Sequence, residues 1–179
     1  YYEIIKEVYL KIFKKLGFDV KVVEAAGGVF TDVNTHEFQV ICDAGEDIIY
    51  YCQNCDFAQN KEIAKVKAGD KCSNCQGEIK ESKSIEVGNI FQFGTVYSEK
   101  MKVFFTDESG QKKMPYFGSY GIGVTRLIGT IVELFHDDKG IIWPESVAPF
   151  RVNLISLSKE EYADKIYNAL LSAGVEVLY

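Results

Sequence analysis

The sequence of 179 residues predicts an α+β fold, and three observations support this class. Between residues 18 and 122, apolar and polar residues alternate in short segments separated by turn residues, as in antiparallel strands. Apolar residues recur at helical spacing near residues 4–16 and 124–135. After residue 149, a strand, a helix and a second strand begin a βαβ unit. An antiparallel sheet followed by such a unit indicates two domains, 1–145 and 149–179, the second cut off by the chain end.

The first part of the chain is expected to contain one amphipathic helix and three strands. The helix ends before Gly17, at a position that favours glycine. Its apolar residues at helical spacing are Ile4, Ile5, Val8, Ile12, Phe13 and Leu16. A strand over "FDVKVV" and a glycine-containing loop follow. The segment "THEFQVICDAGEDIIYYC" is then expected to form two strands joined by a turn at Asp43–Gly45.

Further strands are expected in "IFQFGTVY", "MKVFFTD" and "MPYFGSYGIG", with a turn at Glu108–Gly110. The segment "VTRLIGTIVELF" is a predicted helix. Its expected buried residues are Leu127, Ile128, Ile131, Val132 and Phe135. Two prolines in "WPESVAPF" indicate a linker, and Ser158 with Glu161 has the spacing of a capping box at the start of the last helix.

The composition is that of an ordinary globular protein, with 47% hydrophobic and 26% charged residues. The net charge of −6 argues against indiscriminate nucleic-acid binding, although a local basic face stays possible. The sequence contains no stretch apolar enough to span a bilayer and no signal peptide at its start. Because residue 1 is Tyr, we expect the chain to begin inside a longer protein. The cysteine usage fits a reducing cytosol, which predicts a cytoplasmic protein without a membrane partner.

Four of the five cysteines form two C-x-x-C pairs, the spacing of a four-thiolate zinc site. The pairs are Cys52 with Cys55 and Cys72 with Cys75. We therefore expect structural Zn²⁺ in a zinc-ribbon-like segment over about residues 50–82, with Cys42 as a buried small side chain. The alternatives are thiols that bind no metal and a redox pair. The redox reading fits less well, because no thioredoxin-type turn is nearby.

The segment "GSYGIGVTR" contains glycines where a strand gives way to a helix, and Arg126 lies in the first turns of that helix. Glycines allow a ligand to approach the backbone, and a helix N-terminus favours anionic groups. Arg126 can offer a planar cation to a phosphate or stack on a base. The glycine order does not match G-x-G-x-x-G, and no Gly-Lys-Ser/Thr is present. Tight strand–helix packing is the alternative explanation.

"GSYGIGVTRLIGTIVE" resembles motif 3 of class II aminoacyl-tRNA synthetases. Together with "THEFQVICDAGEDIIYYC", "IEVGNIFQFGTVYSEKM" and "GIIWPESVAPFRVNLI", in this order, it is similar to bacterial-type prolyl-tRNA synthetases over essentially the whole chain. This resemblance implies an antiparallel class II catalytic sheet flanked by helices, followed by the start of an α/β anticodon-binding domain. It also implies ATP and Mg²⁺ as cofactors. Threonyl-tRNA synthetase fits poorly, because only His36 and His136 are available as histidine metal ligands.

The resemblance implies roles for individual residues. Arg126 matches the motif 3 arginine, a catalytic residue that contacts ATP. The other positions expected to bind ATP are Gly121, Gly123, Gln92 and Thr95. The positions expected to line the substrate pocket are His36, Glu37, Phe93, Gly94 and Ser119. For Gln92 and Thr95 a solvent-facing strand residue is the alternative, and for His36 a structural histidine.

The sequence departs from the family pattern at Asn89, where the family commonly has His, and at Ser119, where it commonly has Cys. These differences put amino-acid discrimination in doubt. Motifs 1 and 2, which supply the dimer interface and the arginine that grips the activated carboxylate, are missing from this sequence. Many bacterial relatives carry a large editing domain near the position of the cysteine segment. The sixteen residues between Cys55 and Cys72 are far too few for one.

We therefore expect a part of a prolyl-tRNA synthetase, an enzyme that activates proline with ATP and transfers it to tRNA(Pro), and that is a homodimer at full length. This chain alone is expected to be inactive. The alternatives are a catalytically inactive synthetase-like protein that serves as a regulatory or binding subunit, and a free zinc-ribbon module that binds nucleic acid. The second of these leaves the motif 3 segment unexplained.

Overall fold

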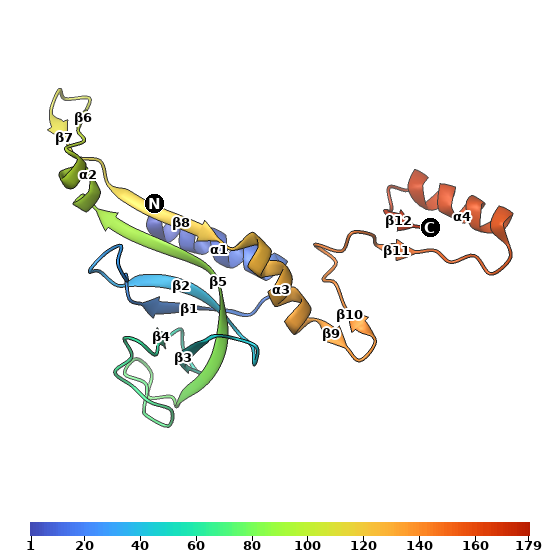
Figure 1. Cartoon of the computed structure of the whole chain (residues 1–179), viewed down its shortest axis with the longest axis horizontal. Coiled ribbons are helices and arrows are strands. Elements are labelled where there is room, and N and C mark those ends of the chain that lie inside the picture. Colours follow the sequence, from blue (N-terminus) through green and yellow to red (C-terminus); the bar gives the residue numbers. More distant parts are fainter. The chain divides into compact units, whose positions relative to one another are not determined.

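The structure is a computed structural model that describes residues 1–179. The chain forms two compact units, Tyr1–Leu134 and Phe135–Tyr179. The first unit contains a sheet in the strand order β2-β1-β4-β3-β5-β8 (Figure 1). Its strands are β1 (Val20–Ala25), β2 (Thr35–Ile41), β3 (Asp47–Cys52), β4 (Ala58–Asn60), β5 (Ile79–Gly94) and β8 (Phe117–Ile122).

This sheet is antiparallel throughout, except that β1 and β4 pair in parallel through Glu24 and Gln59. Because β2 also pairs with β5, strands β1, β2, β5, β3 and β4 form a closed ring. The 16-residue strand β5 connects the ring with β8, since it pairs first with β3, then with β2, and finally with β8. The predicted antiparallel sheet and the turn between β2 and β3 are thereby confirmed, whereas the segment "MKVFFTD", predicted as a strand, contributes no strand to this sheet.

Helix α1 (Tyr2–Lys15) packs on the sheet through Tyr9 and Phe13. Their ring centroids lie 5.1 and 5.4 Å from that of Phe38 on β2. The helix is confirmed, but the prediction of its buried face was partly wrong. Ile4 and Val8 are 63% and 40% exposed, because the sheet contacts α1 along its Tyr9–Phe13 side and covers only part of the apolar stripe.

The remaining elements of the first unit are α2 (Val96–Met101), the short hairpin of β6 (Phe105–Thr106) and β7 (Lys112–Lys113), and α3 (Val124–Leu134). The strand predicted over "IFQFGTVY" ends at Gly94, whose φ of +57° turns the chain into α2. In α3, Ile131 is buried as predicted. Ile128 is 53% exposed, which corrects its predicted burial.

The second unit has the predicted strand–helix–strand order. Strand β11 (Val152–Asn153) precedes α4 (Glu160–Ser172) in the sequence, β12 (Val177–Leu178) follows it, and the two strands pair in parallel. A hairpin of β9 (His136–Asp137) and β10 (Gly140–Ile141) comes before β11. The predicted capping box was wrong. Lys159 is the N-cap, and Ser158 has a φ of +60°, which takes it out of the capping position. Neither unit contains a helix that is long and apolar enough to cross a membrane.

Candidate functional site

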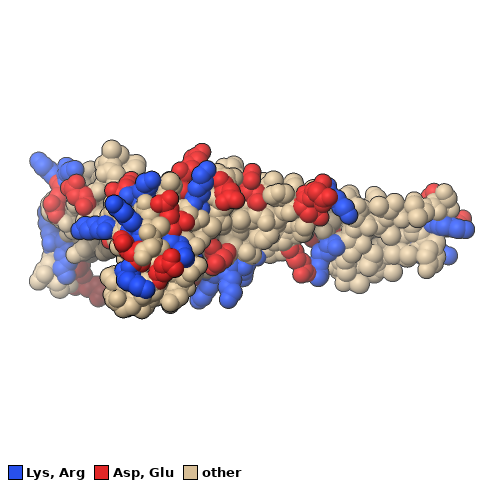
Figure 2. Space-filling view, turned by 90° about the horizontal axis from the view of Figure 1, so that it is seen from below, with Lys and Arg blue, Asp and Glu red and all other residues tan.

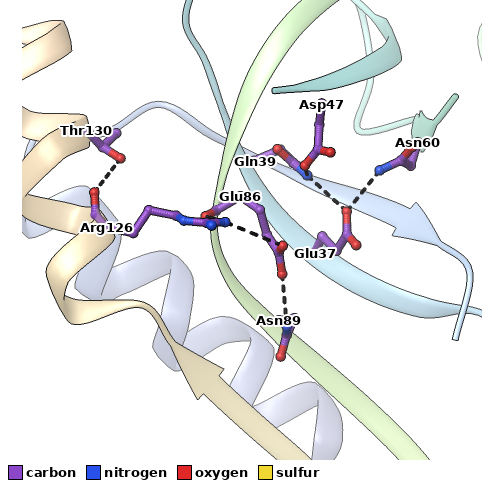
Figure 3. A network of polar contacts seen from close by, with 8 residues as sticks. All are labelled: Glu37, Gln39, Asp47, Asn60, Glu86, Asn89, Arg126 and Thr130. Atoms are coloured by element: carbon purple, nitrogen blue, oxygen red, sulfur yellow. Dashed lines mark hydrogen bonds and ion pairs between the residues drawn. The ribbon is translucent and has the colours of Figure 1, made fainter. Parts of the chain in front are cut away.

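A network of polar side chains lies on the side of β2 that faces away from α1. Since side chains alternate along a strand, the contact of Phe38 with α1 places Glu37 and Gln39 on the opposite side. The Gln39 amide Nε2 donates to Glu37 Oε2 (2.9 Å) and to Asp47 Oδ2 (2.8 Å) (Figure 3). Asn60 Nδ2, from β4, also donates to Glu37 Oε2 (3.2 Å). Three strands of the ring, β2, β3 and β4, thus contribute to the network around Glu37.

The environment of Glu37 disfavours the ionised form of its carboxyl. Burial is the main cause that raises the pKa of this carboxyl, and the nearby carboxylates Glu86 and Asp47 raise it further. The hydrogen bonds from Gln39 and Asn60 oppose these effects, because they stabilise the ionised form. Gln39 is fully buried, and its Oε1 atom has no hydrogen-bond partner.

Arg126 reaches the same region from the first turn of α3. Its Nη1 atom donates to the Glu86 carbonyl oxygen (3.3 Å) and lies 3.8 Å from Glu86 Oε2. The other carboxylate oxygen of Glu86 accepts a hydrogen bond from Asn89 Nδ2 (2.9 Å) (Figure 3). The side chain of Arg126 is 51% exposed, so the guanidinium keeps donors available for a ligand.

The glycines before α3 set the direction of Arg126. Gly121 lies opposite Asn89 in the β5–β8 pairing, and a Cβ atom at this position would be 3.1 Å from Asn89 Oδ1. Gly123 donates its N–H to the Val87 carbonyl (3.2 Å), and its own carbonyl accepts from Leu127 at the start of α3. The turn therefore keeps the beginning of the helix against β5, where Arg126 meets Glu86.

A cavity of about 390 Å³ lies beside Arg126. Its polar lining includes Glu46, Asp47, Ser84, Glu86, Arg126 and Thr130. Ser84 is fully buried, and its hydroxyl oxygen has no hydrogen-bond partner. Because carboxylates outnumber the single guanidinium, this cavity suits a ligand that brings a positive charge, or an anion that carries a metal cation.

The remaining predicted site residues lie apart from this network. The Tyr2 hydroxyl and His36 Nδ1 are 2.8 Å apart, so His36 contacts α1 on the Phe38 side of β2. Burial lowers the pKa of His36. On β5, Gln92 is exposed opposite Gly118, and Phe93 stacks on Phe91 at 5.6 Å.

Three further predicted positions lie near the α2 end of β5 and β8. Gly94 ends β5, and the Thr95 hydroxyl donates to Glu99 Oε1 at 2.5 Å. Ser119 lies opposite Phe91. The structure thus brings Arg126 and Glu37 into one region with Gly121 and Gly123. It places the residues from Gln92 to Thr95 further along β5.

The four predicted metal-ligand cysteines come together where β3 ends and β5 begins. Their sulfur atoms all lie within 4.8 Å of one another. Cys52 Sγ lies 3.4 Å from Cys75 Sγ, and Cys55 Sγ lies 3.6 Å from Cys72 Sγ. Four thiolates around one tetrahedral ion, with bonds of about 2.3 Å, lie roughly 3.8 Å apart, so this donor set fits Zn²⁺.

The two halves of the cysteine cluster have the same local geometry. The backbone N–H of Asn54 points to Cys52 Sγ, and that of Asn74 points to Cys72 Sγ, both at 3.4 Å. Such N–H contacts stabilise thiolates in the form that binds metal. Cys42 is buried and takes no part in the cluster, as predicted.

Four residues of the network were not found from the sequence. They are Gln39, Asp47, Asn60 and Glu86. A polar residue at every second position of "HEFQV" was a usable signal for Gln39, because a strand with one apolar face must turn its polar residues to the other. For Asp47 and Asn60 the sequence held no local signal, since only the ring of strands brings them together.

Charged side chains of both signs are interspersed over the face shown in Figure 2. No continuous basic stripe is visible on that face, which agrees with the net charge of −6. Neither unit therefore presents a broad positive field to a nucleic acid on the side shown.

The chain belongs to the family of class II tRNA synthetase core domains (G, H, P, S and T), whose family model matches residues 1–135. Within this class, the curated relatives are proline–tRNA ligases. The protein of Wolbachia pipientis wMel is 42% identical over 191 residues, which cover 99% of this chain and 45% of that protein. The protein of Sulfurimonas denitrificans is 35% identical over 202 residues, with coverages of 99% and 46%.

The fold is also that of a solved prolyl-tRNA synthetase from Cryptosporidium parvum, a structure described as complexed with L-proline and AMP. It matches with a TM-score of 0.64 and 20% identity, over 98% of this chain and 31% of that one. The predicted resemblance to prolyl-tRNA synthetases is confirmed. The chain spans less than half the length of these curated relatives.

Proposed function

We propose that this chain is the motif 3 part of a prolyl-tRNA synthetase, which activates proline with ATP and transfers it to tRNA(Pro). In activation, a carboxylate oxygen of proline attacks the α-phosphorus of ATP. The bond to the bridging oxygen breaks, and pyrophosphate leaves. The 42% identity to a proline–tRNA ligase over nearly the whole chain supports this substrate. A residue that aligns a phosphate and neutralises its charge is the main requirement for such a transfer.

The observation that carries the proposal is the position of Arg126. Its half-exposed guanidinium lies at the start of α3, beside a cavity and next to a glycine turn that packs the helix closely against β5. In the proposed enzyme, Arg126 binds phosphate oxygens of ATP. Its contacts with Glu86 keep the guanidinium over β5 until ATP takes up its free donors.

The carboxylates around Arg126 support Mg²⁺ as the partner of ATP. Glu86, Asp47 and Glu37 would repel a bare nucleotide, and a hard divalent cation with oxygen ligands removes this repulsion. The same excess of negative charge suits the cationic imino group of proline. Glu37 is the proposed contact for the amino acid, and Gly121 and Gly123 form the floor of the nucleotide site. The substrate pocket is proposed to be lined from the α2 side by Ser119, Phe93 and Gly94, and to include His36. ATP is also proposed to contact Gln92 and Thr95.

A structural Zn²⁺ is proposed in the cysteine cluster. The buried apolar group around these cysteines contains only Tyr50 and Ile79 besides Cys52 and Cys72, so a metal would supply stability that this small core lacks. Residues 149–179 are proposed as the start of the anticodon-binding domain. At full length we propose a cytoplasmic homodimer.

The test is proline-dependent exchange of pyrophosphate into ATP by the full-length enzyme. Arg126→Ala should lower the exchange rate at least about 100-fold, the effect of removing one positioned charge partner in a transition state. The matched control is Arg151→Ala, the other arginine of the chain, which pairs with Glu145 on the surface. A near-normal rate for Arg126→Ala would remove this residue from the site and contradict the proposed function.

A further inference from the structure

The segment between the two cysteine pairs makes three side-chain hydrogen bonds, to β2, to β1 and to the residue after β1. It begins with β4, which starts three residues after Cys55 and lies between β1 and β3. Asn60 Nδ2 donates to Glu37 Oε2 at 3.2 Å. Gln59 Nε2 donates to Glu24 Oε2 at 2.9 Å, and Glu62 Oε1 accepts the backbone N–H of Ala26 at 2.9 Å.

We propose that Asn60 is a positioning residue that holds the Glu37 carboxylate in the site. The cysteine cluster in turn places Asn60 within hydrogen-bonding distance of Glu37. The proposal rests on the proposed function only in that it takes Glu37 as a substrate contact. Glu37 receives hydrogen bonds from two amides, those of Gln39 and Asn60. Gln39 shares its two N–H groups between Glu37 and Asp47 and is fully buried, so it has no donor left to replace Asn60.

The cysteine cluster determines where β4 runs. The chain leaves β3 at Cys52, turns through Cys55 and returns as β4, and the Cys52 N–H closes this turn by donating to the Phe57 carbonyl (2.9 Å). A metal bound by Cys52 and Cys55 would fix both ends of the same turn. Asn60 lies opposite Ile49 on β3, two residues further from the turn than Ala58. Metal binding and the position of Glu37 are therefore connected through one short strand.

The charges around Glu37 determine how loss of Asn60 should change the pH dependence of activity. Asp47 of β3 and Glu86 of β5 face this carboxyl, and Arg126 of α3 pairs with Glu86, while β1 contributes the apolar Val23 opposite Glu37. With two carboxylates nearby, loss of the Asn60 donor makes ionisation of Glu37 harder. The acidic limb of the pH profile of kcat/KM for proline should then move to higher pH. The KM for proline should also rise about 10-fold, the effect of one hydrogen bond to a charged group.

The experiment measures pyrophosphate exchange against pH for the full-length Asn60→Ala and Asn60→Asp enzymes. Asn60→Asp keeps the side-chain shape but replaces the donor with a third carboxylate, so its limb should move further than that of Asn60→Ala. The matched control is Gln59→Ala on the same strand, which removes the bond to Glu24 and should leave the limb in place. A second readout is hydrogen exchange of the β4 amides, which should become faster when a chelator removes the metal.

Unchanged acidic limbs in both Asn60 variants, at normal metal content, would overturn this inference. So would β4 amides that exchange equally slowly with and without metal. Either result leaves the proposed function intact as long as Arg126→Ala still lowers the exchange rate at least about 100-fold. If Arg126→Ala instead exchanges pyrophosphate at a near-normal rate, the proposed function itself is contradicted.

Discussion

Adding a single methyl group at Gly77 should weaken metal binding by the cysteine cluster. A Cβ atom at this position would be 2.9 Å from Cys52 Sγ and 3.0 Å from Asn54 Nδ2, well inside ordinary contact distances. Cys52 cannot move away easily, because it is buried and pairs with Ile79 across β3 and β5. Overpacking of this kind costs about 1–3 kcal/mol, which corresponds to a loss of roughly 5- to 150-fold in affinity.

The assay is a competition for Zn²⁺ between the protein and a chromophoric chelator under reducing conditions. Metal analysis comes first and should give one equivalent for the unmodified protein. The control is Gly129→Ala in α3, where a Cβ atom meets nothing within 4 Å and alanine favours the helix by about 1 kcal/mol. If Gly77→Ala binds Zn²⁺ as tightly as the unmodified protein, the described arrangement of the thiols is not the one that binds the metal.

Two further predictions concern pH. Burial raises the pKa of the Glu37 carboxyl in the folded protein above its value in the unfolded chain. The protonated carboxyl therefore favours the folded state at low pH, and this contribution to stability is lost as the pH rises through the folded-state pKa. Glu37→Gln should therefore raise the free energy of unfolding in urea at pH 8 while it lowers exchange activity, and a loss of stability at pH 8 would contradict this sign. In the β6–β7 turn, the hydrogen bond from Lys113 and then that from Ser109 lower the pKa of Asp107 to about 2. Asp107→Asn should accelerate amide exchange in residues 105–113 at neutral pH, and the difference from the unmodified protein should shrink as the pH falls through about 2. An equal difference at all pH values would mean that the carboxylate charge has no part in the turn.

Local patterns in the sequence were enough to predict most elements of the sheet. The alternation in "THEFQV" and the turn at Asp43–Gly45 were correct, because a strand with one buried face imposes a period of two. The buried face of α1 was predicted less well. Its apolar residues cover a wide stripe, and only contact with Phe38 decides that Phe13 is buried while Ile4 is exposed.

The candidate site was predictable where a residue type implies its chemistry. The spacing of the cysteines was sufficient for the cluster, since two C-x-x-C turns need only to meet. Arg126 was identified from its place after a glycine turn. By contrast, Asn60 and Asp47 reach Glu37 only because β4 and β3 complete the ring with β1 and β2. A contact that depends on the order of strands cannot be inferred from the residues on either side of it in the sequence.

The pairing of Cys52 with Ile79 has a consequence for how this fold can change in length. The two residues are neighbours across β3 and β5, so the 26 residues between them leave and re-enter the sheet at one place. Loop closure adds only about 0.6 kcal/mol for each doubling of length, so a much longer or shorter insert can be exchanged here with little strain on the strands. The exchange has one condition. An insert that does not return a strand beside β1 removes the amide donor of Asn60, and Glu37 must then take its second partner from elsewhere.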